Sequence, residues 1–121
     1  MDGLVMLVSA SQGLGELMAW LIDETSYSLI RASKEQEALK MLDDHDVKCI
    51  MIDLIARDYG AGFLNQIAHK AGEKSIPVVL LRGQEGIQRE IPVAGRRVVE
   101  LRTPFSRSKI LTILDLLLLK P

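Results

Sequence analysis

The chain has a single cysteine, almost no net charge and no long hydrophobic run. Cys49 has no second cysteine to pair with, which excludes an internal disulfide and fits a reducing compartment. The 15 basic and 16 acidic residues leave a formal charge of −1, so no overall attraction draws the chain to nucleic acid or anionic lipid. The apolar cluster at residues 116–119 is far shorter than the roughly 20 residues of a membrane span, and the N-terminus lacks the basic region of a secretory signal. We therefore expect a cytoplasmic protein that contacts neither nucleic acid nor membrane.

Five short apolar runs alternate with segments of helical spacing. Hydrophobic residues make up 48% of the chain, enough for the core of one domain, and we expect residues 1–121 to form it. The alternation predicts βαβ units with right-handed crossovers, and so an α/β fold: a doubly wound, five-stranded parallel sheet in a three-layer sandwich. The expected strands are residues 4–8, 27–32, 48–52, 77–81 and 98–101, and the expected helices are residues 14–22, a segment that follows Ser33, 63–71 and 106–120.

Local signals set three further expectations. Ser33, with Gln36 three residues later, is typical of a helix N-cap with a capping box. Gly72 follows the apolar stripe of residues 63–71 and predicts the end of that helix. Glycine and proline recur in residues 82–97, so we expect the helix between the last two strands to be short or irregular.

Asp53 is the main candidate for a functional residue. It closes the apolar run of residues 49–52, which predicts a carboxylate at the carboxyl end of a buried strand. Open α/β sheets bind ligands in the crevice outside that end of their strands. His45 and His69 are isolated, with no second ligand at metal-binding spacing, so we expect no metal site there.

The order of elements and several short motifs resemble the receiver domain of bacterial two-component response regulators. The resemblance implies a receiver-like, flavodoxin-like fold and a role in signal transduction or phosphorelay. In that family an aspartate at the end of the third strand accepts phosphate from a histidine kinase, and Asp53 holds that position. The motifs that carry the resemblance are Ile52-Asp53-Leu54, Gly62-Phe63, the run of residues 76–81 and Thr103-Pro104-Phe105.

The family's remaining pocket residues are replaced in this chain. Its acidic pair, which holds Mg²⁺, corresponds to Ser9 and Ala10; its strand-end hydroxyl corresponds to Arg82, and its lysine to Thr103. The pattern resembles the atypical or pseudo-receiver subgroup, which implies no bound metal or cofactor and no catalysis by the chain itself.

The same replacements have a physical consequence. Mg²⁺ prefers near-octahedral oxygen ligation with one or two carboxylates, and Asp53 is the one evident acid for the crevice unless Asp58 folds back. Phosphoryl transfer also needs cations that neutralise developing charge, and here Arg82 or Arg57 would have to supply them. Arg82 has two interpretations: an inward-pointing cation that pairs with Asp53, or a solvated arginine at the start of a loop.

The last helix carries leucines beyond its core stripe. Ile110, Ile113, Leu114 and Leu117 fall on one side at helical spacing, with Leu118 at the margin, whereas Leu116 and Leu119 point elsewhere. Arg102 belongs to a locally basic stretch around the fifth strand that could receive an acidic partner. In the resembling family this side of the domain is the usual dimer or partner surface. We therefore expect a protein partner or a homodimer to bind through the fifth strand and last helix, using Leu116, Leu119 and Arg102.

Three functional hypotheses follow. The first is a pseudo-receiver that acts as an interaction and regulatory module without Mg-dependent phosphorylation, and the second is an atypical receiver that is phosphorylated on Asp53. The third rests on the run of residues 10–15, in which Gly13 and Gly15 follow a strand and open a helix, as in the cofactor loop of short-chain dehydrogenases. Its first glycine is replaced by Ser9, so a tight connection is the alternative explanation.

Overall fold

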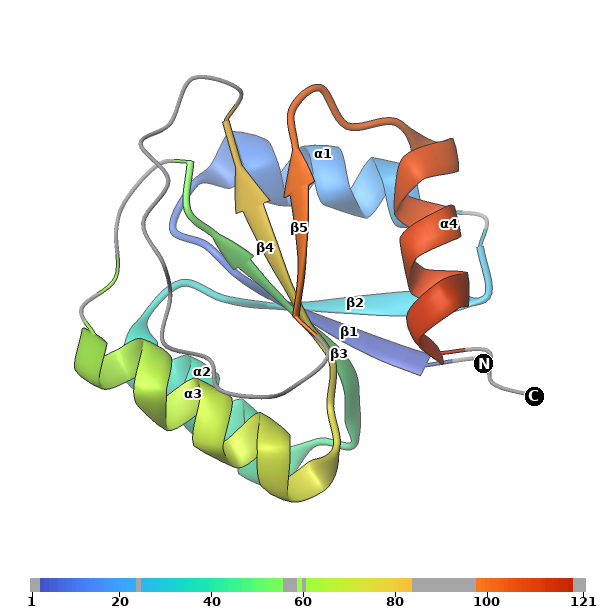
Figure 1. The fold of residues 1–121 in the computed structure, drawn as a ribbon. Coiled ribbons are helices and arrows are strands. Elements are labelled where there is room, and N and C mark those ends of the chain that lie inside the picture. The colour runs from blue at the N-terminus through green and yellow to red at the C-terminus, as the bar shows by residue number, and fades with distance from the viewer. Residues whose placement is uncertain (1–2, 24, 56–58, 60, 84–97, 119–121) are drawn as a thin grey trace.

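The computed structural model describes residues 3–23, 25–55, 59, 61–83 and 98–118. These residues form five strands and four helices that alternate along most of the chain (Figure 1). In order they are β1 (Gly3–Val8), α1 (Gln12–Ile22), β2 (Tyr27–Ala32), α2 (Glu35–Asp44), β3 (Val47–Asp53), α3 (Ala61–Lys74), β4 (Val78–Arg82), β5 (Val98–Arg102) and α4 (Arg107–Leu118).

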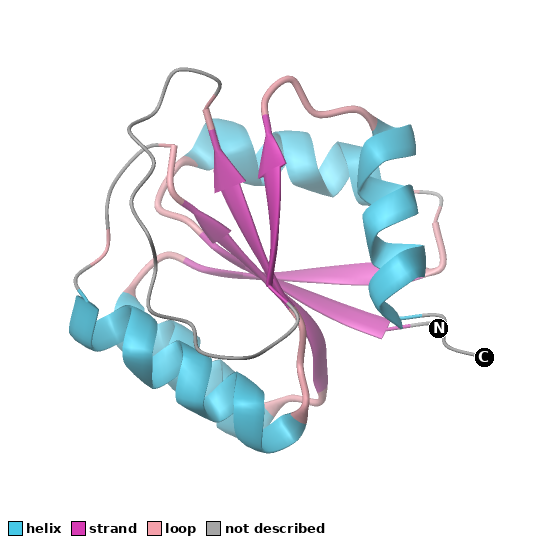
Figure 2. Cartoon of the chain, viewed as in Figure 1, coloured by secondary structure: helices cyan, strands magenta, loops and turns pink. Residues whose placement is uncertain are grey.

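The sheet has the strand order β2-β1-β3-β4-β5, and every neighbouring pair is parallel. Helices α1 and α4 lie on one face of the sheet and α2 and α3 on the other (Figures 1 and 2). This is the doubly wound, three-layer α/β fold that the alternation of apolar runs predicts, and the prediction is confirmed. The expected helix between the last two strands falls in residues 84–97, outside the described residues.

Two hydrophobic clusters hold the layers together, because successive side chains of a strand point to opposite faces. Met6 and Ile50 contribute to the cluster under α2 and α3, whereas Leu7 and Met51 contribute to the cluster under α1 and α4. All four are fully buried, and each stabilises the fold by about 1.5–3 kcal/mol relative to an exposed side chain. Strands buried on both faces read as continuous apolar runs, which explains why β1, β3 and β4 stand out in the sequence.

The predicted cap of α2 is wrong by one residue. Lys34 occupies the N-cap position without a side-chain hydrogen bond, and the helix begins at Glu35. Ser33 instead donates its backbone N–H to Glu37 Oε1 at 2.7 Å. Glu37 therefore accepts the backbone hydrogen bond that the predicted capping box assigned to Gln36.

Helix α3 does not end at Gly72, so that prediction is also wrong. The helix continues to Lys74 and ends at Ser75, which adopts a left-handed φ of 56°. The Ile76 N–H donates to the Ala71 carbonyl at 2.8 Å and the Ser75 N–H to the Gly72 carbonyl at 3.3 Å, the paired bonds of a Schellman motif. Burial of Ile76 fixes this geometry, so a serine takes the conformation that favours glycine.

No helix among the residues that the structure describes is both long and apolar enough to cross a membrane.

Candidate functional site

Asp53 ends β3 at the carboxyl edge of the sheet, as predicted, but its carboxylate is enclosed. The residue is 1% exposed. Its Oδ2 accepts a hydrogen bond from the Ser9 hydroxyl at 2.7 Å, and its Oδ1 accepts one from the Ile55 backbone N–H at 2.8 Å. Hydrogen bonds of this kind compensate a buried carboxylate for lost hydration. Both oxygens therefore already have protein donors.

Ser9 connects Asp53 to the start of α1. It follows β1 directly and is held by a backbone hydrogen bond from its N–H to the Ala32 carbonyl at 2.9 Å. Its hydroxyl oxygen also accepts from the Ser11 N–H at 3.0 Å, so one side chain orders the whole β1–α1 turn. Ala10 is exposed, and its side chain offers no ligand atom. Within the described part of the chain, no group of three or more His, Cys, Asp or Glu residues is placed to hold a metal ion.

Arg82 ends β4 and is buried, so the interpretation as a solvated arginine is wrong. The residue is 9% exposed, and its Nε lies 3.3 Å from Glu100 Oε2 on the neighbouring strand β5. Strand register explains the pairing: Glu100 sits beside Leu80, and Arg82 is the next residue of β4 on the same face. The sequence offered no signal for Glu100, because its role depends on which strand is the neighbour of β4.

Arg102 contacts the same carboxylate from its own strand. Its Nη2 lies 2.5 Å from Glu100 Oε1, and its Nη1 donates to the Gly83 carbonyl at 3.0 Å. Arg82, Glu100 and Arg102 form a cluster that we call the strand-end triad. The triad consists of two cations and one anion, and it connects the carboxyl end of β4 to the carboxyl end of β5.

Thr103 follows β5 and continues the same edge. Its N–H donates to the Arg82 carbonyl at 3.0 Å, and the peptide bond to Pro104 is cis. Ser9, Asp53, Arg82 and Thr103 thus all lie at the carboxyl ends of adjacent strands, as the resemblance implies. Thr103 places a hydroxyl side chain at the end of β5, and arginines on β4 and β5 supply positive charge among the described residues of this edge.

One glycine of the β1–α1 turn, Gly15, has a structural explanation. The Ser11 hydroxyl caps α1 by accepting from the Leu14 N–H at 3.2 Å. A side chain at Gly15 would meet the Arg31 guanidinium carbon at 2.2 Å, so glycine permits Arg31 of β2 to lie over the helix. Gly13, by contrast, is open. The Arg31 guanidinium thus lies over α1 at Gly15, whereas no neighbouring atom requires a glycine at position 13.

Two hydrophobic residues on the helices are prominently exposed. Leu116 of α4 is 76% exposed, which agrees with its predicted position off the core stripe, while Leu119 lies outside the described residues. Trp20 of α1 is 63% exposed and was not identified from the sequence. The Arg107 guanidinium lies 4.9 Å from the Trp20 ring centroid and donates to the Trp20 and Leu21 carbonyls at 2.7 and 3.1 Å. The Arg107 contact depends on the packing of α4 against α1, which a single sequence does not reveal.

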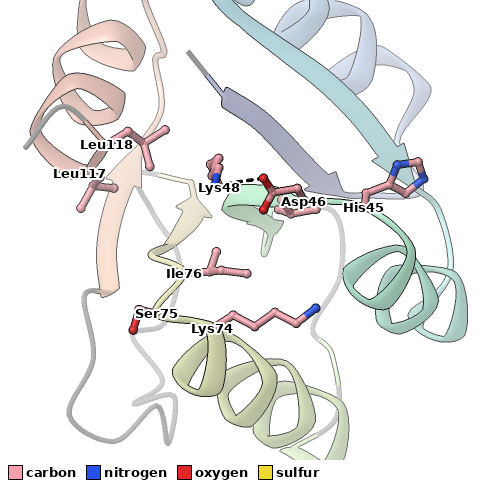
Figure 3. Close-up of a pocket in the computed structure, with 9 residues that line it drawn as sticks. His45, Asp46, Lys48, Lys74, Ser75, Ile76, Leu117 and Leu118 are labelled. Carbon is pink, nitrogen blue, oxygen red and sulfur yellow. Dashed lines mark ion pairs between the residues drawn. The ribbon is translucent and has the colours of Figure 1, made fainter. Parts of the chain in front are cut away.

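A depression of about 250 Å³ lies at the opposite, amino-terminal edge of the sheet (Figure 3). Residues 45–48 and 74–76 line it together with Leu117 and Leu118. Its cations are already engaged, since Lys48 Nζ pairs with Asp46 Oδ2 at 3.1 Å and Lys74 donates to the Leu42 carbonyl. These contacts lie at the amino-terminal end of β3 and the carboxyl end of α3, whereas Asp53 lies at the carboxyl end of β3.

Cys49 is fully buried in β3, and burial raises the pKa of its thiol to about 12. The thiolate is the reactive form of cysteine, and the raised pKa keeps the Cys49 thiol protonated. Cys49 therefore serves as a core residue.

Comparison with known proteins places this geometry in a structural class. No family model and no curated protein matches the chain. Among solved structures, a putative response regulator from Chloroflexus aurantiacus is similar with a TM-score of 0.79 and 19% identity, over 98% of both chains. The receiver domain of the sensor histidine kinase PA1611 from Pseudomonas aeruginosa, with magnesium in its active-site cleft, is similar with a TM-score of 0.79 and 16% identity, also over 98% of both chains.

A third similar structure is NtrX from Brucella abortus in complex with ADP, with a TM-score of 0.77 and 16% identity. The match covers 98% of this chain but 26% of NtrX, so the chain corresponds to about a quarter of that protein. Identities of 16–19% establish architecture and not activity. The chain has the fold of a response-regulator receiver domain.

Proposed function

We propose that the chain is a receiver-like signalling domain that acts by binding a protein partner and does not undergo Mg-dependent phosphorylation. The observation that carries this proposal is the enclosed carboxylate of Asp53, whose two oxygens accept from the Ser9 hydroxyl and the Ile55 N–H. Where a receiver would place acidic metal ligands, this chain has Ser9 and Ala10. Asp53 is then a structural acceptor that orders the carboxyl edge of the sheet.

The chemistry of phosphoryl transfer supports this assignment. Catalysis there consists almost entirely of positioning the phosphoryl group and stabilising its charge, mostly with metal ions and cations. An attacking carboxylate must also reach its donor, and Asp53 is 1% exposed. Phosphorylation of Asp53 Oδ2 would break its bond to Ser9, and the resulting acyl phosphate would carry about two negative charges in place of the single charge of the carboxylate. The arrangement favours a fixed structural carboxylate.

Partner binding is proposed at β5 and α4, through Leu116, Leu119 and Arg102. Leu116 supports this placement, since a leucine that is 76% exposed on the outer side of a helix contributes nothing to the core. A homodimer through the same surface is the simplest form of the proposal. Replacing Leu116→Asp should abolish association measured by sedimentation at rising concentration, whereas the matched change Leu17→Asp on α1 should not.

The decisive experiment is an amide NMR titration with Mg²⁺ and then beryllofluoride, a phosphoryl mimic. We expect the resonances of Asp53, Ser9 and Thr103 to stay unchanged at millimolar ligand. Shifts at Asp53 that spread to β5 and α4 would show a working phosphorylation pocket and refute the proposal.

A second candidate function is phosphorylation of Asp53 without the usual metal site. It is favoured by the position of Asp53 at the end of β3, in a fold similar to that of the magnesium-bound PA1611 receiver domain. Incubation with a small phosphodonor followed by intact mass measurement separates the two functions. Added phosphate that disappears in Asp53→Asn would establish the second.

A further inference from the structure

We infer that the solvent-facing side of α1 is a binding site for a basic segment of a partner protein. This side, which we call the outer face of α1, carries Glu16, Leu17 and Trp20 and ends at Asp23, and all four residues are exposed. The inference goes beyond the proposed function, because the site lies on a different helix from Leu116 and binds a segment of stated charge. Three features of the outer face carry it.

The first feature is an exposed tryptophan on a helix that other residues anchor to the core. Trp20 is 63% exposed, and Leu17, one turn earlier on the same side of the helix, is 39% exposed. Met18 and Leu21 are buried and pack α1 on the sheet without help from Trp20. Tryptophan is enriched among the residues that dominate binding energy at protein interfaces. Trp20 is therefore available to a second molecule.

The second feature is a guanidinium that already lies over this ring. The Arg107 guanidinium carbon is 4.9 Å from the Trp20 ring centroid, so the ring accepts a cation in the free domain. Arg107 is fixed in this place because it donates to the Trp20 and Leu21 carbonyls. An aromatic ring has two faces, and the exposure of Trp20 leaves ring surface for a second cation.

The third feature is the sign of the charges on the outer face. Helix α1 contains no lysine, arginine or histidine, and the acids Glu16 and Asp23 lie one turn before and one turn after Trp20. Glu16 accepts a hydrogen bond from Gln12 Nε2 at 3.2 Å. Among the residues that the structure describes, neither carboxylate pairs with a cation. A basic side chain of a partner would find a carboxylate and an aromatic face side by side.

Two arginines of neighbouring elements lie beside α1, and neither cancels these acids. Arg107 directs its donors to carbonyls at the end of α1. Arg31 of β2 lies over Gly15, which is buried and so belongs to the sheet-facing side of the helix. With Arg107 included, the outer face carries two negative charges and one positive charge. Complementary charge steers association and selects among partners, so this face favours a basic segment.

The test uses the fluorescence of Trp20, which is the single tryptophan of the chain. The full chain is titrated with hexaarginine at low ionic strength, with hexaglutamate as the comparison, and we expect saturable quenching by hexaarginine alone. Calorimetry should show that Glu16→Gln binds hexaarginine about threefold more weakly, since one exposed ion pair is lost. Trp20→Leu should bind about tenfold more weakly, and Trp20→Phe, which keeps an aromatic face, should recover most of that loss.

Glu73→Gln is the matched control, because it removes the same charge from an exposed position of α3, on the opposite face of the sheet (Figure 1). An equal loss of affinity in Glu16→Gln and Glu73→Gln would overturn the inference by showing general charge attraction. Unaltered Trp20 fluorescence would also overturn it. Self-association that is lost in Trp20→Leu would do the same, because the occupant would then be a second copy of this chain.

Leu116→Asp separates this site from the surface of β5 and α4. The variant should bind hexaarginine as the unchanged chain does, and a loss of binding would overturn the inference by placing the peptide on α4. None of these outcomes depends on beryllofluoride or on association through Leu116, so failure here is distinguishable from failure of the proposed function.

Discussion

Replacing Ser9→Ala tests whether Asp53 is a structural residue. The change removes the hydroxyl that donates to Asp53 Oδ2 at 2.7 Å and accepts from the Ser11 N–H at 3.0 Å. A hydrogen bond to a charged group contributes about 1.5–3 kcal/mol, and the Asp53 oxygen that loses its donor is buried. We expect a loss of about 2–3 kcal/mol from a total of roughly 5–15 kcal/mol. With a urea slope of about 1–1.5 kcal/mol/M, the unfolding midpoint should fall by about 2 M.

The assay is urea unfolding followed by circular dichroism, with Ser108→Ala on the exposed side of α4 as the control. Surface substitutions of that kind stay within about 0.5 kcal/mol. A double-mutant cycle with Asp53→Asn then isolates the pair, and residues in direct contact couple by about 0.5–3 kcal/mol. The reasoning is refuted if Ser9→Ala loses no more than Ser108→Ala, or if the cycle shows no coupling.

Three further predictions concern the pocket, the core and a helix end. The pair Ser9→Asp and Ala10→Asp should create Mg²⁺ binding that calorimetry detects, because it adds two carboxylates beside Asp53; no heat of binding would contradict the pocket assignment. Cys49 should resist thiol reagents at pH 8 until urea unfolds the chain, because burial raises its pKa to about 12. The stability that its neutral thiol contributes should decline only as pH rises from about 9 towards 12. Ser75→Gly should raise the free energy of unfolding by about 0.5–1 kcal/mol, because glycine adopts the φ of 56° without strain, and a lower urea midpoint would count against the Schellman assignment.

The sequence predicts the architecture well because burial determines it. Strands β1, β3 and β4 are buried on both faces, so their apolar runs are continuous and their positions are legible to within one or two residues. The placement of Asp53, Arg82 and Thr103 at one edge follows from the same pattern, since parallel strands bring their carboxyl ends together.

The partners of these residues could not be predicted in the same way. Glu100 pairs with Arg82 because β5 lies beside β4 in a particular register, and no local pattern encodes that register. The sequence also predicts the end of α3 at the wrong residue, for a related reason. Gly72 is the stronger local signal, but burial of Ile76 outweighs it and moves the helix end to Ser75.

The proposed function makes a prediction about the cations at the carboxyl edge of the sheet. A bound metal ion can leave, so a pocket that depends on one responds to its supply, whereas arginine keeps its charge at any physiological pH. Among the residues that the structure describes, Arg82 and Arg102 carry positive charge at this edge, and both are fixed in the covalent structure. The stability of the domain should therefore be the same with Mg²⁺ as with a chelator.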